Sequence, residues 1–365
     1  MRPQLRKEVA TVSDANGATD TPLLEVKSLV KQFSIPGTKA VVHACSDVTL
    51  TVRRGETLGI IGESGSGKTT LGRCVLRLLE PTSGQVLFEG NDLTSLSRKE
   101  MRKLRTDVQI VFQEPFDSLN PQMTVGRQIG EPLRIHIDLG KTARKTRVLE
   151  LLELVGLPPS TYEALPRQLS PGALQRASIA RAMSTDPKLI VLDEPTSALA
   201  PEAEAEVIGL LKRIQEETGI AYIFISHDLS LVGEICDSVA IMYLSQVIES
   251  GTREQVFDNP RHPYSRALLA AVLLPDPSKR RDDAARAERL EGEIPSPIDL
   301  PAGCFLASRC HFVRDRCESE PQQLLSAGED GHDARCWRVA ENDLKTEEIE
   351  RLRAERRADT ADASA

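Results

Sequence analysis

Short apolar runs alternate along this chain with longer segments that have a helical spacing of apolar residues. Several of the runs are apolar throughout, which predicts strands buried on both faces. The predicted strands are Thr57–Ile61, Val108–Phe112, Leu189–Leu192, Ala221–Ile225 and Val239–Tyr243. A helical pattern over Ala203–Thr218 stops at Gly219, a residue type that often follows a helix end. This alternation predicts an α/β core with a mainly parallel sheet.

The composition divides the chain into segments. Residues 1–21 are polar without an apolar period and predict a disordered tail. Residues 22–274 carry the α/β pattern, and residues 275–290 predict a linker. Residues 291–341 form an extension rich in proline and cysteine, with little periodicity. Residues 342–365 are highly charged and predict a frayed or disordered tail.

The overall composition excludes several classes of protein. A net charge of −8 and 4% aromatic residues argue against a nucleic-acid-binding surface. No apolar run approaches the length that a membrane-spanning helix needs, and residues 1–21 lack the apolar region of a secretory signal. We therefore expect a cytoplasmic protein that reaches a membrane only through a partner.

A glycine-rich segment follows the first predicted strand. Residues 62–69 read GESGSGKT, which fits the pattern G-x-x-x-x-G-K-[ST]. The segment lies between a predicted strand and a predicted helix, as this motif requires. This context argues against the alternative, a simple turn with a solvated lysine. Its glycines let backbone N–H groups face phosphates, Lys68 can reach the β- and γ-phosphates, and the Thr69 hydroxyl can bind Mg²⁺. The predicted nucleotide-binding residues are Gly62, Glu63, Ser64, Gly65, Ser66, Gly67, Lys68, Thr69 and Thr70.

Two acidic residues follow the apolar run at 189–192. Asp193 is expected to hold Mg²⁺ indirectly, and Glu194 to polarise the attacking water. If the acidic pair stood alone, the simpler interpretation would be two solvated carboxylates at the end of a strand. Because the chain also carries the glycine-rich segment, we favour a role for this pair in ATP chemistry.

Five motifs occur in the order typical of ABC-type ATPases. After the glycine-rich segment come VFQEPFDSLNP, LSPGALQR, LDEPTSALA and the triplet Ser226-His227-Asp228. Over about residues 23–274 the chain resembles the nucleotide-binding subunit of an ABC transporter. FQEPFDSLNP, the run HPYSRALL at 262–269 and the Cys-rich extension resemble the oligopeptide/dipeptide importer branch. The resemblance implies a P-loop core, a helical subdomain near residues 115–180 and an antiparallel β subdomain near the N-terminus.

The resemblance also implies roles for further residues. Gln113 resembles the glutamine that ligates Mg²⁺ and senses the permease, and His227 resembles the histidine that contacts the γ-phosphate. Phe33 is a candidate for the aromatic residue that stacks on adenine, with a core phenylalanine as the alternative. Ser170 and Gly172 lie in the signature segment, which acts on the ATP of a partner ATPase subunit.

The chain departs from the family pattern at two places. The usual signature Leu-Ser-Gly-Gly-Gln reads LSPGA here, so Pro171 removes a backbone N–H and Ala173 removes a side-chain amide. Ala200 stands where the family usually has aspartate. We expect the opposite ATP site, built with this signature, to hydrolyse poorly, and the partner ATPase to be a different subunit. Harmless sequence drift is the alternative.

Four of the seven cysteines gather in the C-terminal extension: Cys304, Cys310, Cys317 and Cys336. Four thiolates can hold Zn²⁺ or an iron–sulfur cluster, and the segment has few apolar residues to form a core. The gaps are wider than those of zinc knuckles, and the resemblance of residues 303–310 to the importer extension points to a [4Fe–4S] cluster. His311 or His332 could replace a cysteine on zinc. Four reduced, unliganded cysteines are the remaining alternative.

The resemblance implies an ATPase that powers import of peptides or related solutes. It implies ATP and Mg²⁺ as ligands, and two transmembrane permease subunits and a separate solute-binding protein as partners. It places the chain at the cytoplasmic face of the inner membrane as a peripheral protein, with no nucleic-acid partner. A soluble ABC-type ATPase on nucleic acid or ribosomes, or a regulatory pseudo-ATPase, are the alternatives.

Overall fold

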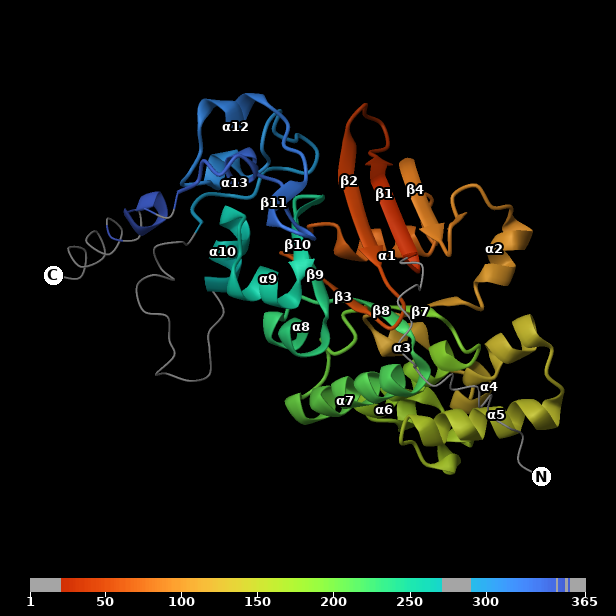
Figure 1. Ribbon diagram of the computed structural model, residues 1–365. Coiled ribbons are helices and arrows are strands. Elements are labelled where there is room, and N and C mark those ends of the chain that lie inside the picture. Colours follow the sequence, from red (N-terminus) through yellow and green to blue (C-terminus); the bar gives the residue numbers. More distant parts are fainter. Residues whose placement is uncertain (1–20, 271–289, 346, 352–353, 355–365) are drawn as a thin grey trace.

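The computed structural model describes residues 21–270, 290–345, 347–351 and 354 (Figure 1). Nearly all of the predicted N-terminal tail and linker, and much of the charged C-terminal tail, lie outside these residues. An eight-stranded sheet with the order β11-β12-β10-β9-β3-β8-β7-β6 forms the centre, and a four-stranded sheet with the order β2-β1-β4-β5 packs nearby.

The five predicted strands are all present and form the parallel part of the large sheet. They are β3 (Thr57–Ile61), β6 (Val108–Val111), β7 (Leu189–Asp193), β8 (Ala221–Ile225) and β9 (Ser238–Tyr243). Alternate residues of β7 enter two different apolar cores: Ile190 and Leu192 pack on one face, and Leu189 and Val191 on the other. Burial on both faces explains the apolar runs in the sequence.

The smaller sheet is antiparallel and near the N-terminus, as expected. Its strands are β1 (Leu24–Ser34), β2 (Val41–Val52), β4 (Ser83–Phe88) and β5 (Asn91–Asp92). Helix α1 (Lys68–Val75) contributes Leu71, Cys74 and Val75 to the core shared by the two sheets. Helix α2 (Arg98–Leu104) begins with a capping box between Ser97 and Glu100, which satisfies its first backbone donors.

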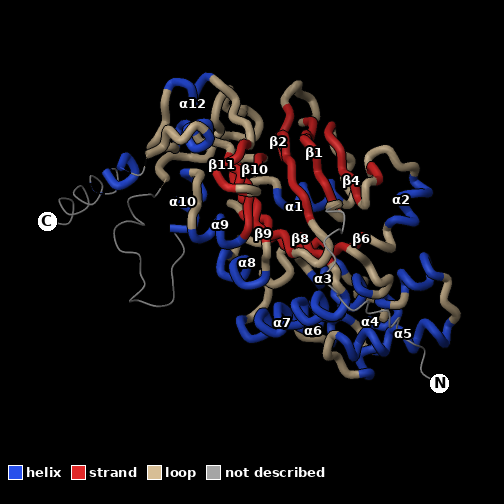
Figure 2. Tube along the Cα trace, viewed as in Figure 1, coloured by secondary structure: helices blue, strands red, loops and turns tan. Residues whose placement is uncertain are grey.

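A helical subdomain lies below the large sheet in the view of Figure 2, over the range predicted from the sequence. Its elements are α3 (Pro115–Ser118), α4 (Val125–Ile129), a π-helical turn (Leu133–Ile137), α5 (Lys141–Leu154), two 3₁₀ turns (Pro159–Glu163 and Pro166–Gln168) and α6 (Pro171–Met183). Helices α7 (Pro201–Thr218) and α8 (Leu229–Ile235) connect the later parallel strands. Helix α7 ends at Gly219, whose φ of 67° suits a residue without a Cβ.

The C-terminal extension joins the large sheet. After β10 (Gln246–Thr252), α9 (Arg253–Asp258) and α10 (Pro263–Ala270), it adds a 3₁₀ turn (Ala307–Arg309), α12 (Asp315–Ser319), β11 (Leu325–Glu329), β12 (His332–Ala334) and α13 (Trp337–Ala340). Strand β12 pairs antiparallel with β10. Three residues are too few to show an alternating pattern, so this attachment could not be predicted from the sequence.

Candidate functional site

The glycine-rich segment forms a curled loop between β3 and α1. Lys68 Nζ donates hydrogen bonds to the carbonyl oxygens of Gly62 and Glu63, at 2.8 and 3.0 Å. Gly67 has a φ of 104°, and a Cβ there would lie 2.0 Å from the carbonyl oxygen of Ala44. Burial lowers the pKa of Lys68, although the charge of Glu194 opposes this. The loop therefore curls around a buried lysine side chain.

Two oxygen-bearing side chains meet beside this loop. Thr69 Oγ1 donates a hydrogen bond of 2.9 Å to Asp193 Oδ1, and Asp193 is 1% exposed. Burial raises the pKa of Asp193, while the bond from Thr69 favours its ionised form. Hydroxyl and carboxylate oxygens are ligands that Mg²⁺ prefers, so the residues fit this ion.

Two predicted catalytic residues, Gln113 and His227, contact the third, Glu194. Gln113 Nε2 donates to Glu194 Oε2 at 3.0 Å, and His227 Nδ1 lies 3.3 Å from the same oxygen. The three residues follow β6, β7 and β8, which are parallel neighbours, so their carboxyl ends share one edge of the sheet. Glu194 has a φ of 47°, which turns the chain sharply after β7. The structure thus brings together residues far apart in sequence.

Phe33 lies near the end of β1 and is 37% exposed. Lys31 Nζ lies 4.8 Å from the centre of its ring. The alternative of a core phenylalanine is therefore wrong, because the ring faces solvent. The ring is available for stacking, and adenine stacking stays a prediction.

The signature segment forms the start of α6. Ser170 Oγ accepts a hydrogen bond from the N–H of Ala173, and Pro171 occupies the first helical position. A Cβ on Gly172 would lie 3.1 Å from the Cβ of Ala203 in α7, so this glycine allows close packing of the two helices. Helix α6 therefore keeps its N-terminal turn despite the departures at 171 and 173.

The four C-terminal cysteines line one cavity of about 20 Å³, together with apolar side chains such as Leu306 and Phe312. Burial raises the pKa of Cys304 to about 11 and that of Cys310 to about 12. Among the residues that the structure describes, no group of three or more metal-ligating side chains is arranged around a single ion. His332 Nε2 lies 2.8 Å from Glu249 Oε1, so the suggestion that His332 replaces a cysteine on zinc is not supported by its geometry.

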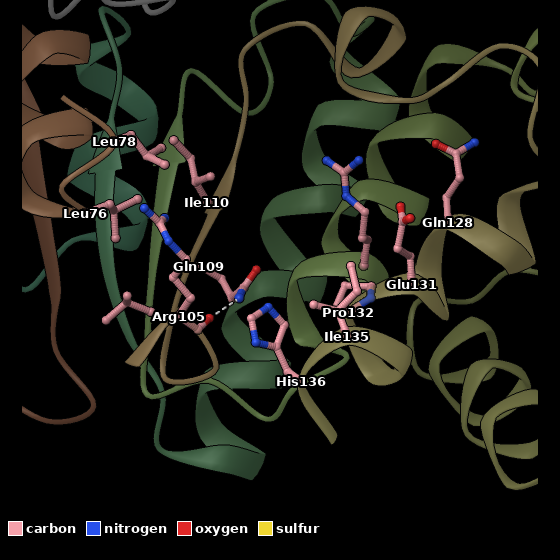
Figure 3. Close-up of a pocket in the computed structure, with 12 residues that line it drawn as sticks. Leu76, Leu78, Arg105, Gln109, Ile110, Gln128, Glu131, Pro132, Ile135 and His136 are labelled. Carbon is pink, nitrogen blue, oxygen red and sulfur yellow. Dashed lines mark hydrogen bonds between the residues drawn. The ribbon is translucent and has the colours of Figure 1, made fainter. Parts of the chain in front are cut away.

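A groove of about 270 Å³ lies between the core and the helical subdomain, and the sequence analysis missed it. Figure 3 shows Leu76, Leu78 and Ile110 on one side, and Pro132, Ile135 and His136 on the other. Three large apolar side chains in the lining or next to it in the chain are exposed: Leu78, Ile135 and Ile137. The one sequence signal was the pair of apolar residues flanking His136 in a short polar segment.

Comparisons with known proteins show the family to which the chain belongs. Residues 45–197 match the ABC transporter family, and residues 248–317 match the C-terminal region of oligopeptide/dipeptide transporters. A Brucella ovis protein, provisionally named a peptide import ATP-binding protein, is 44% identical over 322 residues, covering 88% of this chain and 99% of that protein. The oligopeptide transport ATP-binding protein OppF of Salmonella typhimurium is 41% identical, covering 87% of this chain and 96% of its own length.

Solved ABC cassettes share the fold. The dimeric cassette MJ0796 bound to ADP and phosphate is 28% identical, with a TM-score of 0.58, covering 63% of this chain and 98% of that one. The protein cbiO1 of Clostridium perfringens, part of an ABC transporter complex, is 31% identical with a TM-score of 0.58, covering 65% of this chain and 91% of that one.

The fold and the site define an ABC-type ATPase. The chain belongs to the ABC transporter family as an ATP-binding subunit, and it carries the C-terminal region of the oligopeptide/dipeptide branch. Within the described parts of the chain, no helix combines the length and apolar character needed to cross a membrane.

Proposed function

We propose that this chain hydrolyses ATP at the loop formed by residues 62–70 and thereby powers a permease that imports peptides or related solutes. The convergence of Gln113 and His227 on Glu194 supports this proposal most directly. A carboxylate held at the edge of the sheet, beside a buried lysine, is suited to polarise water for attack on a γ-phosphate. The names of the Brucella and Salmonella relatives support a peptide cargo.

The roles of the other residues follow from their positions. Thr69, Asp193 and the amide oxygen of Gln113 would hold Mg²⁺, which supplies positive charge to the transferred phosphoryl group. The backbone of the loop and Lys68 would hold the phosphates, and Phe33 would stack on the adenine. His227 would contact the γ-phosphate.

The partners follow from the transporter assignment. The chain would bind two transmembrane permease subunits at the cytoplasmic face of the inner membrane, as a peripheral subunit, and a separate binding protein would deliver the solute to the permease. ATP would act as a ligand that favours the closed ATPase pair, and hydrolysis would reopen it.

The ATPase pair would be asymmetric. The phosphate loop of this chain keeps Glu194, whereas its signature carries Pro171 and Ala173. Pro171 at the first position of α6 supplies no N–H to a partner's γ-phosphate, although Ser170 and Gly172 remain. The partner ATPase would therefore be a different subunit whose own ATP is hydrolysed poorly. An equal pair of active sites in a tight homodimer would contradict this.

The groove between core and helical subdomain would receive a helical segment of the permease. Its lining is apolar on both sides, and the two cations Arg105 and Arg181 outnumber the one carboxylate, Glu131. An amphipathic segment with an acidic residue would complement this surface. Gln113 follows the lining residue Ile110 by three positions in the chain and donates a hydrogen bond to Glu194, so it would link permease binding in the groove to the ATP site.

A variant of the groove tests the permease contact. Ile135→Asp should abolish co-purification with the permease subunits and leave ATP binding by the isolated subunit unchanged. Ile298→Asp, which changes an equally exposed isoleucine in the C-terminal extension, is the matched control and should not affect assembly. Normal assembly of the Ile135→Asp protein would exclude the groove as the docking surface.

The C-terminal thiols would hold a [4Fe–4S] cluster with a structural role. The four cysteines line one cavity, and four thiolates are the donor set of such a cluster. The cluster would join the four cysteines and stabilise a segment that has few apolar residues.

Metal analysis tests the thiol proposal. Anaerobically purified protein should show the broad visible absorption of an iron–sulfur cluster and contain iron and sulfide. Cys310→Ser should lose the absorption, whereas Cys74→Ala, which changes a core cysteine outside the extension, should keep it. A colourless protein with one zinc would reject the cluster, and a protein without metal would reject both.

Reconstitution tests the function as a whole. The chain should co-purify with permease subunits, and peptide addition should stimulate ATP hydrolysis when the solute-binding protein is present. Association with ribosomes or DNA in place of permease subunits would overturn the transporter proposal.

A further inference from the structure

The C-terminal extension reaches the phosphate loop through one side chain. Arg309 lies in the 3₁₀ turn between Cys304 and Cys310. The distance between its Nη1 atom and Oε1 of Glu63 is 3.7 Å. Glu63 is the second residue of the loop, and its carbonyl oxygen accepts a hydrogen bond from Lys68. Residues 246 positions apart in sequence therefore face each other at the place where phosphates would bind.

Two tyrosines hold the Arg309 side chain in this position. Its Nη1 donates a hydrogen bond of 3.4 Å to the hydroxyl of Tyr243, and its guanidinium carbon lies 5.7 Å from the centre of that ring. Tyr243 in turn packs against Tyr264, with ring centres 4.7 Å apart. The Arg309 side chain is only 10% exposed. A cation held over an aromatic ring and largely shielded from water acts more strongly on a neighbouring carboxylate than a surface arginine does.

The extension is fixed to the core on both sides of the loop. Arg335 Nη1 lies 3.1 Å from Oδ2 of Asp47 in β2, and Arg335 Nε donates a hydrogen bond to the carbonyl oxygen of Val247 in β10. The carbonyl oxygen of Pro297 accepts a hydrogen bond of 2.9 Å from the N–H of His43. His43 precedes Ala44, whose carbonyl oxygen lies against Gly67 at the end of the loop. Figure 1 shows the extension beside β10 and α10, on the same side of the molecule as β2.

We propose that Arg309 is a positioning residue of the ATP site, through which the Cys-rich extension supports the phosphate loop. An acidic side chain inside a phosphate-binding loop repels the phosphates that the loop must hold. Arg309 offsets the charge of Glu63 and fixes the direction of that side chain. This inference rests on the nucleotide site proposed above. If it holds, the affinity of the core for ATP depends on Arg309, a residue that lies between two cysteines of the extension.

A double-mutant cycle tests the proposal in the full-length protein, with Mg-ATP binding measured by displacement of a fluorescent ATP analogue. Arg309→Ala should weaken ATP binding about fivefold, which is the scale of losing one partly shielded charge pair. Arg309→Lys keeps the charge and should restore most of the affinity. Glu63→Gln should tighten ATP binding slightly, and in that background Arg309→Ala should have little further effect. High salt should reduce the effect of Arg309→Ala only in part, because the Arg309 side chain is largely shielded from water.

The controls separate this role from a general loss of structure. Arg314→Ala removes another arginine of the extension, one whose charged partner is Glu348, and should leave ATP affinity unchanged. If Arg309→Ala fails to fold, Arg309→Gln removes the charge while keeping a donor for Tyr243. An equal loss of affinity with and without Glu63→Gln, or no loss at all, would overturn the proposal. If the wild type and Lys68→Ala bind ATP equally, the nucleotide site itself fails, and the role of Arg309 fails with it.

Discussion

Thr69 donates a hydrogen bond to Asp193 across 124 positions of sequence. The contact follows from the order β3-β8-β7 in the parallel sheet, since the loop after β3 and the end of β7 lie at the same edge. A hydroxyl and a buried carboxylate are thereby placed next to the phosphate loop. The candidate Mg²⁺ site formed by Thr69 and Asp193 therefore depends on the order of the strands in the sheet, and not on a local motif.

Two substitutions separate ATP binding from hydrolysis. Lys68→Ala should weaken ATP binding about 10- to 100-fold, the scale of one charge-assisted hydrogen bond. Glu194→Gln should leave binding intact and lower hydrolysis about 100-fold or more, because only water activation is lost. Nucleotide binding and steady-state hydrolysis in the reconstituted transporter measure both effects. Full turnover by the Glu194→Gln protein would refute the role of Glu194.

The metal contact can be tested by comparing nucleotide binding with and without Mg²⁺. Asp193→Asn removes the buried negative charge, so Mg²⁺ should no longer increase the affinity for ATP. Binding of ATP in the presence of a chelator should change little, because Lys68 still contacts the phosphates. A normal dependence on Mg²⁺ in the Asp193→Asn protein would place the ion elsewhere.

The asymmetry of the ATPase pair predicts a gain of function. The combined changes Pro171→Gly, Ala173→Gln and Ala200→Asp restore a backbone donor, an amide and a carboxylate at the opposite ATP site. Hydrolysis by the complete transporter should rise, provided that the partner subunit has an active glutamate. Glu202→Ala on the exposed start of α7 serves as a control and should not raise the rate.

Ala200→Asp alone should also stabilise the fold. Ala200 is the N-cap of α7 and offers no side-chain oxygen to the first N–H groups of the helix. An aspartate at this position accepts such a hydrogen bond and suits the helix dipole, which raises the free energy of unfolding by about 1 kcal/mol. Thermal unfolding followed by circular dichroism should show a higher midpoint. An unchanged midpoint would mean that the new carboxylate does not cap α7.

Stability should fall as the pH falls below the ordinary pKa of histidine. Burial lowers the pKa of His262 to about 4, while Glu249 and Arg335 exert opposing effects on it. Between pH 6.5 and 4 the unfolded chain binds this proton and the folded chain does not, so stability is lost over this window and is complete above it. The shift in pKa from 6.5 to about 4 corresponds to about 3 kcal/mol of unfolding free energy that is lost over this pH window.

The variant His262→Gln isolates this contribution. Urea unfolding at several pH values between 6.5 and 4 should show a shallower loss of stability in the variant than in the wild type. Parallel slopes would show that acidic residues elsewhere cause the whole pH dependence.

Much of this architecture is visible in the sequence. The boundaries of β3 and β8 match the predicted runs without change, because strands buried on both faces leave unbroken apolar segments. Helix α7 begins two residues earlier than the pattern predicts, since Pro201 fits the first helical turn. The phosphate loop was found because its chemistry lies in consecutive residues.

The tertiary structure decided what depends on distant residues. The sequence placed Gln113, Glu194 and His227 at the ends of strands, and only the strand order makes Glu194 their common contact. The contact between Arg309 and Glu63 left no sequence pattern, and the groove left only the apolar residues that flank His136, because each joins segments whose own periodicity is weak or absent. Local pattern determines which elements form, whereas the pairing of strands far apart in the chain determines which side chains meet.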